Sequence, residues 1–385
     1  MGRGVSRYGI VDRNTPITTS VKETAGGLPA VISAWKHGVS KMGFVGSTVS
    51  LGRANQKRGF DCPGCAWPDP KHRSPFEYCE NGAKAVSDEA TIKTIPDSFW
   101  QEHSIHALGR KSDQWLNSQG RLSRPLILER DSNHYVPSDW DRAIGIIAKS
   151  LDALEDPNDA YFYTSGRASN EAAYLWQLLA RQYGTNNLPD CSNMCHESSG
   201  VALNESIGIG KGTVRLEDFD KADLIVIVGQ NPGTNHPRML SALKSAKKSG
   251  ASVLSINPLK ETGMRRFRHP QSPIDMLGAG TQISDDHVNI KINGDMALFR
   301  AIGSIILDKG SHDLDFINLN TTGFLDYAKI AQKIDWDLIE HLTGQDRERI
   351  NEISDYFCRS KRTIVCWAMG ITQHKNSVNT IREIM

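Results

Sequence analysis

The chain has 385 residues, of which 39% are hydrophobic and 23% charged, and its formal net charge is +1. This composition is typical of a globular protein long enough for two or three domains. A net charge this close to zero argues against nucleic acid or a membrane surface as a partner. No apolar run reaches about 18 residues, the length that a membrane helix needs, so we expect no transmembrane segment.

The N-terminus, MGRGVSRYGIVDRNTP, lacks the charged-then-apolar pattern of a secretory signal and shows no twin-arginine export motif. We therefore predict a cytoplasmic protein. The cysteine count, seven, is odd, and a long chain in a reducing compartment rarely uses a disulfide framework. Metal-binding and catalytic roles are favoured for these residues, which are Cys62, Cys65, Cys79, Cys191, Cys195, Cys358 and Cys366.

In chain order, residues 1–60 are predicted to form an irregular N-terminal arm with one candidate helix over residues 29–43. Residues 61–90 contain three cysteines and four prolines, which are too many helix breakers for a long helix. Residues 91–135 resemble a connector anchored by Trp100 and Trp115. We thus predict a small irregular cysteine-containing domain over residues 61–135.

A regular pattern begins near Ser138, which precedes Asp141 at a spacing similar to a capping box and starts a predicted helix. Predicted strands at 160–166, 222–228, 251–258, 286–295 and 362–367 then alternate with predicted helices at 170–184, 238–250 and 296–310. Alternation of this kind predicts right-handed βαβ units. The fold class is therefore α/β, with mainly parallel sheets and flanking helices over residues 136–385.

Polar loops follow the predicted strands, namely TSGRASN, VGQNPGTNHP, SINPLKE, INGD and AMGITQ. Parallel sheets bind ligands at the carboxyl ends of their strands, so these five segments are expected to share one crevice. No G-x-G-x-x-G follows a strand, which argues against a nicotinamide site. The stretch GIGKGT at 208–213 resembles a truncated P-loop, but it lacks the full spacing and a preceding strand.

Three cysteines near the N-terminus have a spacing that suits a metal: Cys62 and Cys65 form a C-x-x-C pair, and Cys79 follows fourteen residues later. A third cysteine argues against a thioredoxin-type redox pair. Three interpretations stay open from the residues alone. They are a zinc site completed by His72, an iron–sulfur cluster with an unidentified fourth ligand, and thiols that bind no metal.

A second site is suggested by the stretch DCSNMCHESSG, in which His196 directly follows Cys195. Cys195 could be a soft thiolate ligand of an active metal, with His196 beside it to handle protons. The alternative is a small buried cysteine and a histidine whose bonds are satisfied locally. Cys191, Cys358 and Cys366 are interpreted as structural.

The order of the motifs resembles the molybdopterin oxidoreductases, and within them the formate dehydrogenase H-like and YdeP-like oxidoreductase alpha subunits. The motifs are the C-x-x-C segment, YTSGRASNEAAYLWQLLARQYGTNN, Cys-His, VGQNPGTNHPRM, SINPLKETG, INGDMALFRAIG and WAMGITQ, from about Cys62 to the end. The resemblance implies a formate dehydrogenase/DMSO reductase-like fold. It also implies that Cys195 ligates the metal, and that Cys62, Cys65 and Cys79 hold a 4Fe-4S cluster in place of zinc.

The resemblance further implies a molybdenum (or tungsten) bis(molybdopterin guanine dinucleotide) cofactor and two-electron oxidation of a small formate-like oxyanion. His196 would orient the substrate or accept its proton, and electrons would pass through the cluster to an unidentified acceptor. Nitrate reduction is the alternative chemistry, and a non-catalytic or zinc-stabilised α/β binding protein is the alternative class. Matched cofactor positions are Gly166, Arg167, Asn170, Gly229, Asn231, His236, Asn257, Pro258, Lys260, Gly294, Asp295, Gly370 and Thr372.

Some matched positions also have plain structural interpretations. Asp295 could accept hydrogen bonds from guanine or cap a helix, and Arg167 could bind phosphate or be solvated. Asn231 and Asn257 could be turn residues only.

The chain also departs from the family pattern. AWPDPKHRSPFEY lengthens the spacing after Cys65, no cysteine lies between Cys79 and Cys191, and only Lys84 and Arg110 are candidates for the family's basic relay residue. Family members continue beyond this sequence, so an N-terminal fragment is expected.

Overall fold

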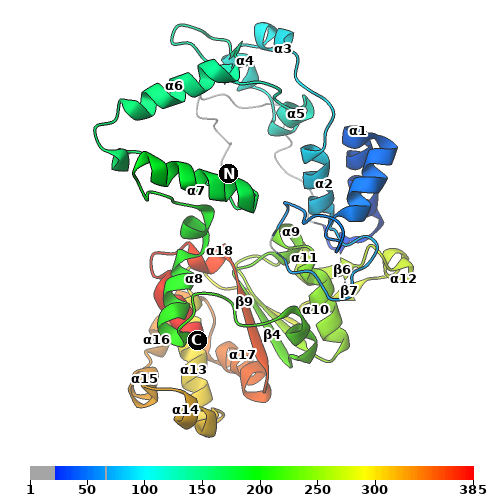
Figure 1. Ribbon diagram of the computed structural model, residues 1–385. Coiled ribbons are helices and arrows are strands. Elements are labelled where there is room, and N and C mark those ends of the chain that lie inside the picture. Colours follow the sequence, from blue (N-terminus) through cyan, green and yellow to red (C-terminus); the bar gives the residue numbers. More distant parts are fainter. Residues whose placement is uncertain (1–21, 66) are drawn as a thin grey trace. The chain divides into compact units, whose positions relative to one another are not determined.

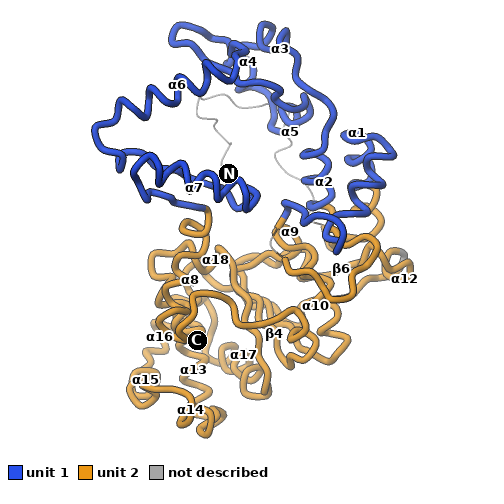
Figure 2. Tube along the Cα trace, in the orientation of Figure 1, with its two compact units in different colours: residues 1–21, 33–64, 81–190 blue, residues 22–32, 65–80, 191–385 orange. Residues whose placement is uncertain are grey.

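The structure is a computed structural model that describes residues 22–65 and 67–385 (Figure 1). The described chain forms two compact units, coloured separately in Figure 2. Unit 1 contains residues 33–64 and 81–190, and unit 2 contains residues 22–32, 65–80 and 191–385. These units are defined by contacts, whereas the predicted arm, cysteine domain and α/β domain rest on composition. The predicted division at residues 60 and 135 stays a prediction.

A four-stranded sheet forms the centre of unit 2. Its strands are β4 (Leu224–Val228), β5 (Ser252–Ile256), β8 (Asp286–Val288) and β9 (Thr363–Trp367), in the spatial order β8-β5-β4-β9. Every neighbouring pair is parallel. The predicted α/β class with a mainly parallel sheet is confirmed.

The strand order reverses once along the chain. The sheet grows from β4 to β5 to β8 in one direction, and β9 then returns to pair with the other edge of β4. The carboxyl ends of β4 and β9 therefore flank a topological switch point, where the chain leaves neighbouring strands in opposite directions. Ligands of open α/β sheets bind in the crevice at such a point.

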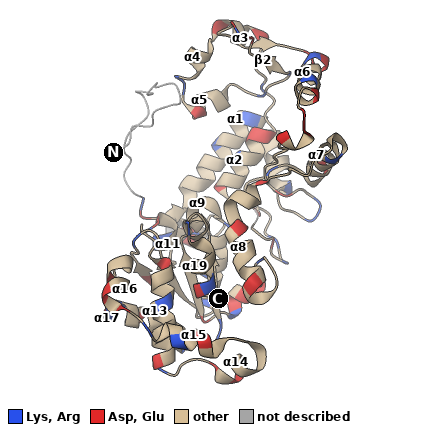
Figure 3. Ribbon diagram, turned by 90° about the vertical axis from the view of Figure 1, so that its left-hand side faces the viewer, with Lys and Arg blue, Asp and Glu red and all other residues tan. Residues whose placement is uncertain are grey.

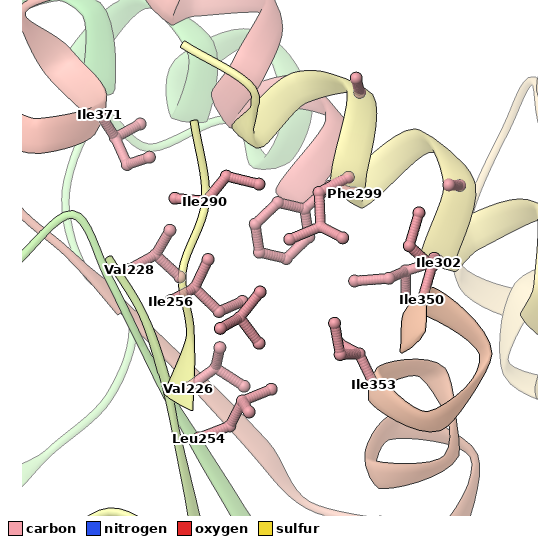
Figure 4. Packing of buried hydrophobic residues seen from close by; sticks show 14 of the residues in the cluster. Val226, Val228, Leu254, Ile256, Ile290, Phe299, Ile302, Ile350, Ile353 and Ile371 are labelled. Carbon is pink, nitrogen blue, oxygen red and sulfur yellow. The ribbon is translucent and has the colours of Figure 1, made fainter. Parts of the chain in front are cut away.

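Both faces of β4 carry apolar side chains, and so helices cover both faces of this sheet. Its five residues have no exposed area, and their side chains alternate between the two faces. On one face Val226 and Val228 pack in a cluster with Phe299 and Ile302 (Figure 4). On the other face Ile225 and Ile227 belong to a cluster with Leu240 and Leu243. Each fully buried side chain of this size contributes about 1.5–3 kcal/mol.

The first cluster draws on α8 (Cys191–Ile207), α13 (Asp295–Asp308), α16 (Trp336–Thr343), α17 (Arg347–Arg359), α18 (Met369–Thr372) and α19 (Ser377–Ile384). The second draws on η2 (Leu216–Lys221), α10 (Met239–Lys248) and α11 (Thr262–Arg265). Unit 2 also contains a small sheet of β1 (Ala25–Gly26), β6 (Arg266–Arg268) and β7 (Thr281–Gln282). Its other helices are α9 (Pro232–Asn235), α12 (Pro273–Leu277), α14 (Leu314–Asn320) and α15 (Phe324–Ala331).

Unit 1 is mainly helical, with one two-stranded antiparallel ribbon. Its elements are most of α1 (Gly27–Arg53), most of α2 (Glu80–Glu89), α3 (Asp97–Glu102), α4 (Ile105–Leu108), α5 (Asp113–Ser118), β2 (Leu126–Ile127), β3 (Val136–Pro137), α6 (Trp140–Asp152), η1 (Pro157–Asp159) and α7 (Asn170–Tyr183). The predicted anchor Trp100 is buried with Ile95 and Leu108, and Trp115 packs against this cluster. Three short helices thus share one small core.

The structure corrects several predicted elements. The strand expected at 160–166 is reduced to a single bridge between Thr164 and Asp190, and both residues lie in unit 1. The cap of α6 is Asp139, not Ser138, because the Asp139 carboxylate accepts a 2.7 Å bond from the backbone N–H of Arg142. The strand expected over 286–295 ends at Val288.

The N-terminal region and the segment 314–359 also differ from expectation. The helix expected over residues 29–43 extends over Gly27–Arg53, with a kink at Gly43. Residues 1–21 of the predicted arm lie outside the described residues. Four helices over residues 314–359 had no counterpart among the predicted elements.

Acidic and basic residues are both dispersed along the ribbon of the described chain (Figure 3). In the part of the chain that the structure describes, none of the helices combines the length and the apolar character needed to cross a bilayer.

Candidate functional site

A cavity of about 570 Å³ lies in unit 2 at the carboxyl ends of the parallel strands. Four of the five polar segments expected to share a crevice contribute to its wall, and so does the first part of α8. The lining residues are Cys195, His196, Gly229, Gln230, Asn231, Asn235, His236, Asn257, Pro258, Glu261, Ile292, Asn293, Asp295, Ala368, Met369, Gly370, Gln373 and His374. The shared crevice is thus confirmed for the segments after β4, β5, β8 and β9.

Two glycines meet at the switch point. Gly229 follows β4 with a φ of +55°, and its carbonyl accepts a 3.0 Å hydrogen bond from the N–H of Gly370. A Cβ on Gly370 would lie 2.5 Å from the carbonyl oxygen of Gly229, and a Cβ on Gly229 would lie 2.8 Å from the carbonyl carbon of Gly370. Only glycine permits this approach of the two backbones. The contact leaves main-chain groups, and no side chain, at this part of the cavity wall.

Cys195 lies in the first part of α8 and lines the cavity. The next residue, His196, has non-helical angles (φ −138°, ψ 19°), so α8 kinks directly after the cysteine. The hydroxyl of Thr372 donates a 2.6 Å bond to the carbonyl of Cys195. The thiol is free and partly exposed. A cysteine that served only as a packed core residue would need no such exposure.

Two of the three histidines that line the same cavity, His196 and His236, have lowered pKa values. Burial lowers the pKa of His196, and burial together with the nearby His196 charge lowers the pKa of His236. His196 Nδ1 lies 3.3 Å from the hydroxyl of Ser199, while the buried Nδ1 of His236 has no partner in the structure. Both imidazoles are therefore neutral at pH 7 and able to accept a proton.

Asp295 is the buried carboxylate of the site. It is 5% exposed, and burial raises its pKa from 3.8 to about 6. The N-cap of α13 is Gly294, so Asp295 is the first helical residue and not the cap. A carboxylate in the first turn is stabilised by the helix dipole and can accept hydrogen bonds from a ligand in the cavity.

The two asparagines after β4 and β5 have different local roles. Asn231 caps the short helix α9, because its side-chain oxygen accepts from the N–H of Thr234 at 3.2 Å. Asn257 is buried, and its amide donates to the carbonyl of Gln230 at 3.2 Å. Asn257 therefore ties the loop after β5 to the loop after β4, and both asparagines also line the cavity.

Six matched positions lie outside this lining. Gly166, Arg167 and Asn170 belong to unit 1, where all three are exposed. Lys260 is exposed beside the cavity loops, Gly294 packs against the backbone of α16 and Thr372 is buried behind Cys195. The segment TSGRASN is thus the one post-strand segment that belongs to unit 1, whereas the cavity belongs to unit 2.

Nine lining residues were not predicted, and most of them flank a predicted position. Glu261 closes SINPLKE and Gln373 closes AMGITQ, so both lie inside segments expected at the crevice, and His374 lies one residue beyond AMGITQ. The hydrophobic lining residues Ile292, Ala368 and Met369 have no sequence feature that marks them as site residues. The nine are Gln230, Asn235, Glu261, Ile292, Asn293, Ala368, Met369, Gln373 and His374.

The N-terminal cysteines are placed in different units. Cys62 is buried in unit 1, whereas Cys65 and Cys79 are partly exposed in unit 2. Over residues 22–65 and 67–385, no group of three or more His, Cys, Asp or Glu side chains is arranged to hold a metal ion. The cluster at these cysteines stays a prediction, as does a relay role for Lys84 or Arg110.

His72, the residue considered as a fourth zinc ligand, lies in another part of unit 2. It lines a second cavity of about 360 Å³, between the segment 67–77 and the helices η2 and α10. Arg238 closes this region, since its guanidinium binds Asp69 at 2.8 Å and Glu77 at 2.9 Å. The lengthened spacer between Cys65 and Cys79 is thus anchored to Arg238, the N-cap residue of α10.

Cys191, Cys358 and Cys366 lie outside the lining of both cavities, and their structural interpretation stays a prediction. Cys366 is part of β9, and burial raises the pKa of its thiol to about 12. Cys358 lies on α17, outside both cavities.

Comparison with known protein families assigns the chain to a family. The family model for the molybdopterin oxidoreductases matches residues 121–385. The chain belongs to the molybdopterin oxidoreductase family. Its cavity lies wholly inside the matched region.

Curated relatives support this assignment. The chain is 47% identical over 370 residues to the "Uncharacterized oxidoreductase Rv2900c" of Mycobacterium tuberculosis, covering 94% of this chain and 48% of the relative. It is 43% identical to "Protein YdeP" of Escherichia coli, covering 95% of this chain and 50% of that protein. Formate dehydrogenase H of Escherichia coli is 28% identical over 269 residues, covering 69% of this chain and 35% of that protein. The chain spans about half the length of the first two of these relatives.

A solved structure has the same fold. Acetylene hydratase from Pelobacter acetylenicus superposes with a TM-score of 0.56 at 19% sequence identity, over 68% of this chain and 34% of that one. Over the superposed part, the two chains thus share an arrangement of strands and helices.

The residues of the cavity fit a molybdopterin. The Gly229–Gly370 contact offers backbone groups that a flat, polar ring system can approach closely, and any side chain there would fill that space. Asn257 and Asp295 supply buried polar groups, and the sulfur of Cys195 is a soft donor of the kind that suits molybdenum.

Proposed function

We propose that this molybdopterin oxidoreductase oxidises a small formate-like oxyanion at a molybdenum centre to which Cys195 contributes the protein ligand. The observation that carries the proposal is the position of Cys195: a partly exposed thiol in a cavity at the switch point of the sheet, beside two neutral histidines. The 28% identity to formate dehydrogenase H favours formate over other oxyanions.

The bound cofactor, as the guanine dinucleotide form, would supply the redox chemistry by accepting two electrons. Gly229 and Gly370 would hold its pterin by backbone contacts, and Asp295 would accept hydrogen bonds from its guanine N–H groups. Asn231, His236, Asn257 and Pro258 would complete the wall on this side. Of the positions outside the lining, we propose that Lys260 and Arg167 contact phosphates and that Gly166, Asn170 and Gly294 shape the surrounding loops.

His196 would handle the proton. Oxidation of formate to carbon dioxide releases one proton and two electrons. Because burial lowers the pKa of His196, its ring is neutral at pH 7 and can accept this proton. Nδ1 is engaged with the hydroxyl of Ser199, so Nε2 is the ring nitrogen left for the exchange.

The cysteines Cys62, Cys65 and Cys79 remain our proposed ligands of a 4Fe-4S cluster. Thiolates are the ligands that such clusters use. Since no three metal-binding side chains converge among the described residues, we assign no electron-transfer step to this group. A cytoplasmic location and an external electron acceptor are part of the same proposal.

The decisive experiment is metal and activity analysis of protein expressed from the whole gene and purified without oxygen. We expect molybdenum in the wild-type protein and formate-dependent reduction of a dye. Cys195→Ala should reduce turnover to background, and Cys358→Ala, which removes a thiol outside the cavity lining, should retain it. Full turnover in Cys195→Ala would reject the ligand role.

The same measurements separate the alternatives. Nitrate-dependent oxidation of a reduced dye, with no formate activity, would indicate a nitrate-reducing enzyme. Protein that contains zinc and no molybdenum would indicate a zinc-stabilised binding protein.

A further inference from the structure

The residue that carries the sulfur is held from behind by the short helix α18. Thr372, the last residue of α18, is 7% exposed, and its hydroxyl donates a 2.6 Å bond to the carbonyl of Cys195. The next residue, Gln373, donates through Nε2 to the carbonyl of Met194, also at 2.6 Å. Two consecutive carbonyls of α8 are therefore bonded to two consecutive side chains after β9.

Further bonds make the connection reciprocal. The hydroxyl of Ser198 donates to the carbonyl of Thr372 at 3.3 Å. The indole N–H of Trp367, at the end of β9, donates to the hydroxyl of Ser199 at 2.9 Å. The first turns of α8 are thus tied to the central sheet on both sides of Cys195.

The kink in α8 explains why such support is needed. Helical geometry alone normally fixes the direction of each carbonyl and of the side chain above it. The non-helical angles of His196 interrupt that geometry one residue after Cys195. Without another constraint, the peptide group between the two residues could rotate and carry the thiol with it.

We propose that Thr372 is a positioning residue that sets the orientation of the Cys195 sulfur toward the cavity. The resemblance assigned Thr372 to cofactor contact, but its side chain lies outside the cavity lining and is bonded to the cysteine backbone instead. The inference rests on the proposed function, because it concerns the sulfur that would ligate the metal. Gln373 supports the same segment and reaches the cavity as well.

Three variants test the role of Thr372. Thr372→Val keeps the shape of the side chain and removes the donor, and Thr372→Ser restores the donor. Ser354→Ala is the matched control, since the buried hydroxyl of Ser354 donates a 2.8 Å bond to the carbonyl of Ile350 in α17, away from the cavity. The control shows what the loss of one buried hydroxyl does to folding alone.

The first measurement uses cofactor-free protein. Iodoacetamide alkylation of Cys195 is followed by mass spectrometry, with Cys358 of the same molecules as internal reference. We expect the Cys195/Cys358 ratio to rise roughly fivefold in Thr372→Val, the factor that one net hydrogen bond is worth. Thr372→Ser should stay near wild type, and so should Ser354→Ala.

The second measurement uses cofactor-loaded protein. X-ray absorption at the molybdenum edge counts sulfur neighbours in wild type, Cys195→Ser and Thr372→Val. We expect one sulfur fewer in Cys195→Ser, a reduced sulfur contribution in Thr372→Val and its recovery in Thr372→Ser.

The outcomes distinguish the two ideas. If Cys195→Ser keeps every sulfur neighbour, the proposed function fails. If Cys195→Ser loses one but Thr372→Val matches wild type in both measurements, only the positioning role of Thr372 fails.

Discussion

Strand β4 and helix α6 are both rich in apolar side chains, but they differ completely in burial. All five residues of β4 have no exposed area, whereas none of the residues of α6 is buried. On α6, Trp140 is 66% exposed and Ile147 is 59% exposed. Strand β4 has strands on both edges and packed clusters on both faces. The contrast shows that the apolar pattern of a segment predicts its secondary structure, while its neighbours decide how much free energy that pattern contributes.

The largest expected difference between the two regions comes from truncating apolar side chains. Leu254→Ala removes a side chain with no exposed area beside β4 and should lower the free energy of unfolding by about 3 kcal/mol. Ile147→Ala on α6 should change it by less than about 0.5 kcal/mol. Urea unfolding followed by tryptophan fluorescence gives both values. Equal losses would show that α6 is covered in solution.

Glycines should respond in opposite directions in the two regions. Gly370→Ala places a Cβ against the backbone of Gly229 and should cost about 2 kcal/mol, because neither backbone can yield without breaking their hydrogen bond. Gly145→Ala on α6 meets no atom within 4 Å and should stabilise its helix by about 0.5–1 kcal/mol. Thermal denaturation of both variants measures the signs. A stabilised Gly370→Ala would contradict the close contact at the switch point.

The buried carboxylate in the first turn of α13 should make stability depend on pH. Burial raises the pKa of Asp295 to about 6, so the stability associated with its neutral form is complete below pH 4 and is lost as the pH rises through 6. Asp295→Asn should therefore be more stable than wild type by about 2 kcal/mol at pH 7, and the gain should vanish near pH 4. Unfolding at both pH values tests the prediction on cofactor-free protein.

The smallest expected effect concerns the cap of α6. Asp139→Ala removes the side chain that accepts from the N–H of Arg142 and should cost about 1 kcal/mol. Ser138→Ala, the position favoured by the sequence pattern, should cost less than Asp139→Ala. Amide hydrogen exchange in the first turn of α6 measures both, and the reverse order would restore Ser138 as the cap.

Much of unit 2 could be predicted because its strands are apolar runs flanked by turn residues. The run LIVIV in β4, the helix closed by Lys247 and Lys248, and the run in β5 leave little choice of structure. The segment AYFYTSG has similar local preferences, but only Thr164 finds a bridge partner, since pairing depends on a neighbouring strand that the sequence does not identify.

The site residues that could be predicted are reactive or polar residues in recognisable sequence segments. Cys195, His236, Asn257 and Asp295 were all identified and all line one cavity. The kink at His196 and the bond from Thr372 to Cys195 left no mark in the sequence, because both arise when α8 and α18 pack together. Spacing alone could not show whether Cys62 joins Cys65 and Cys79.

The meeting of Gly229 and Gly370 also constrains how this protein can diversify. A cavity wall made of peptide groups keeps its hydrogen-bonding pattern when the neighbouring side chains are substituted. Differences in ligand preference must then arise from side chains at the rim of the cavity, where Ile292 and Met369 are exposed. The backbone part of the cavity wall is fixed by the close contact of the two glycines, whereas the side chains at its rim can change.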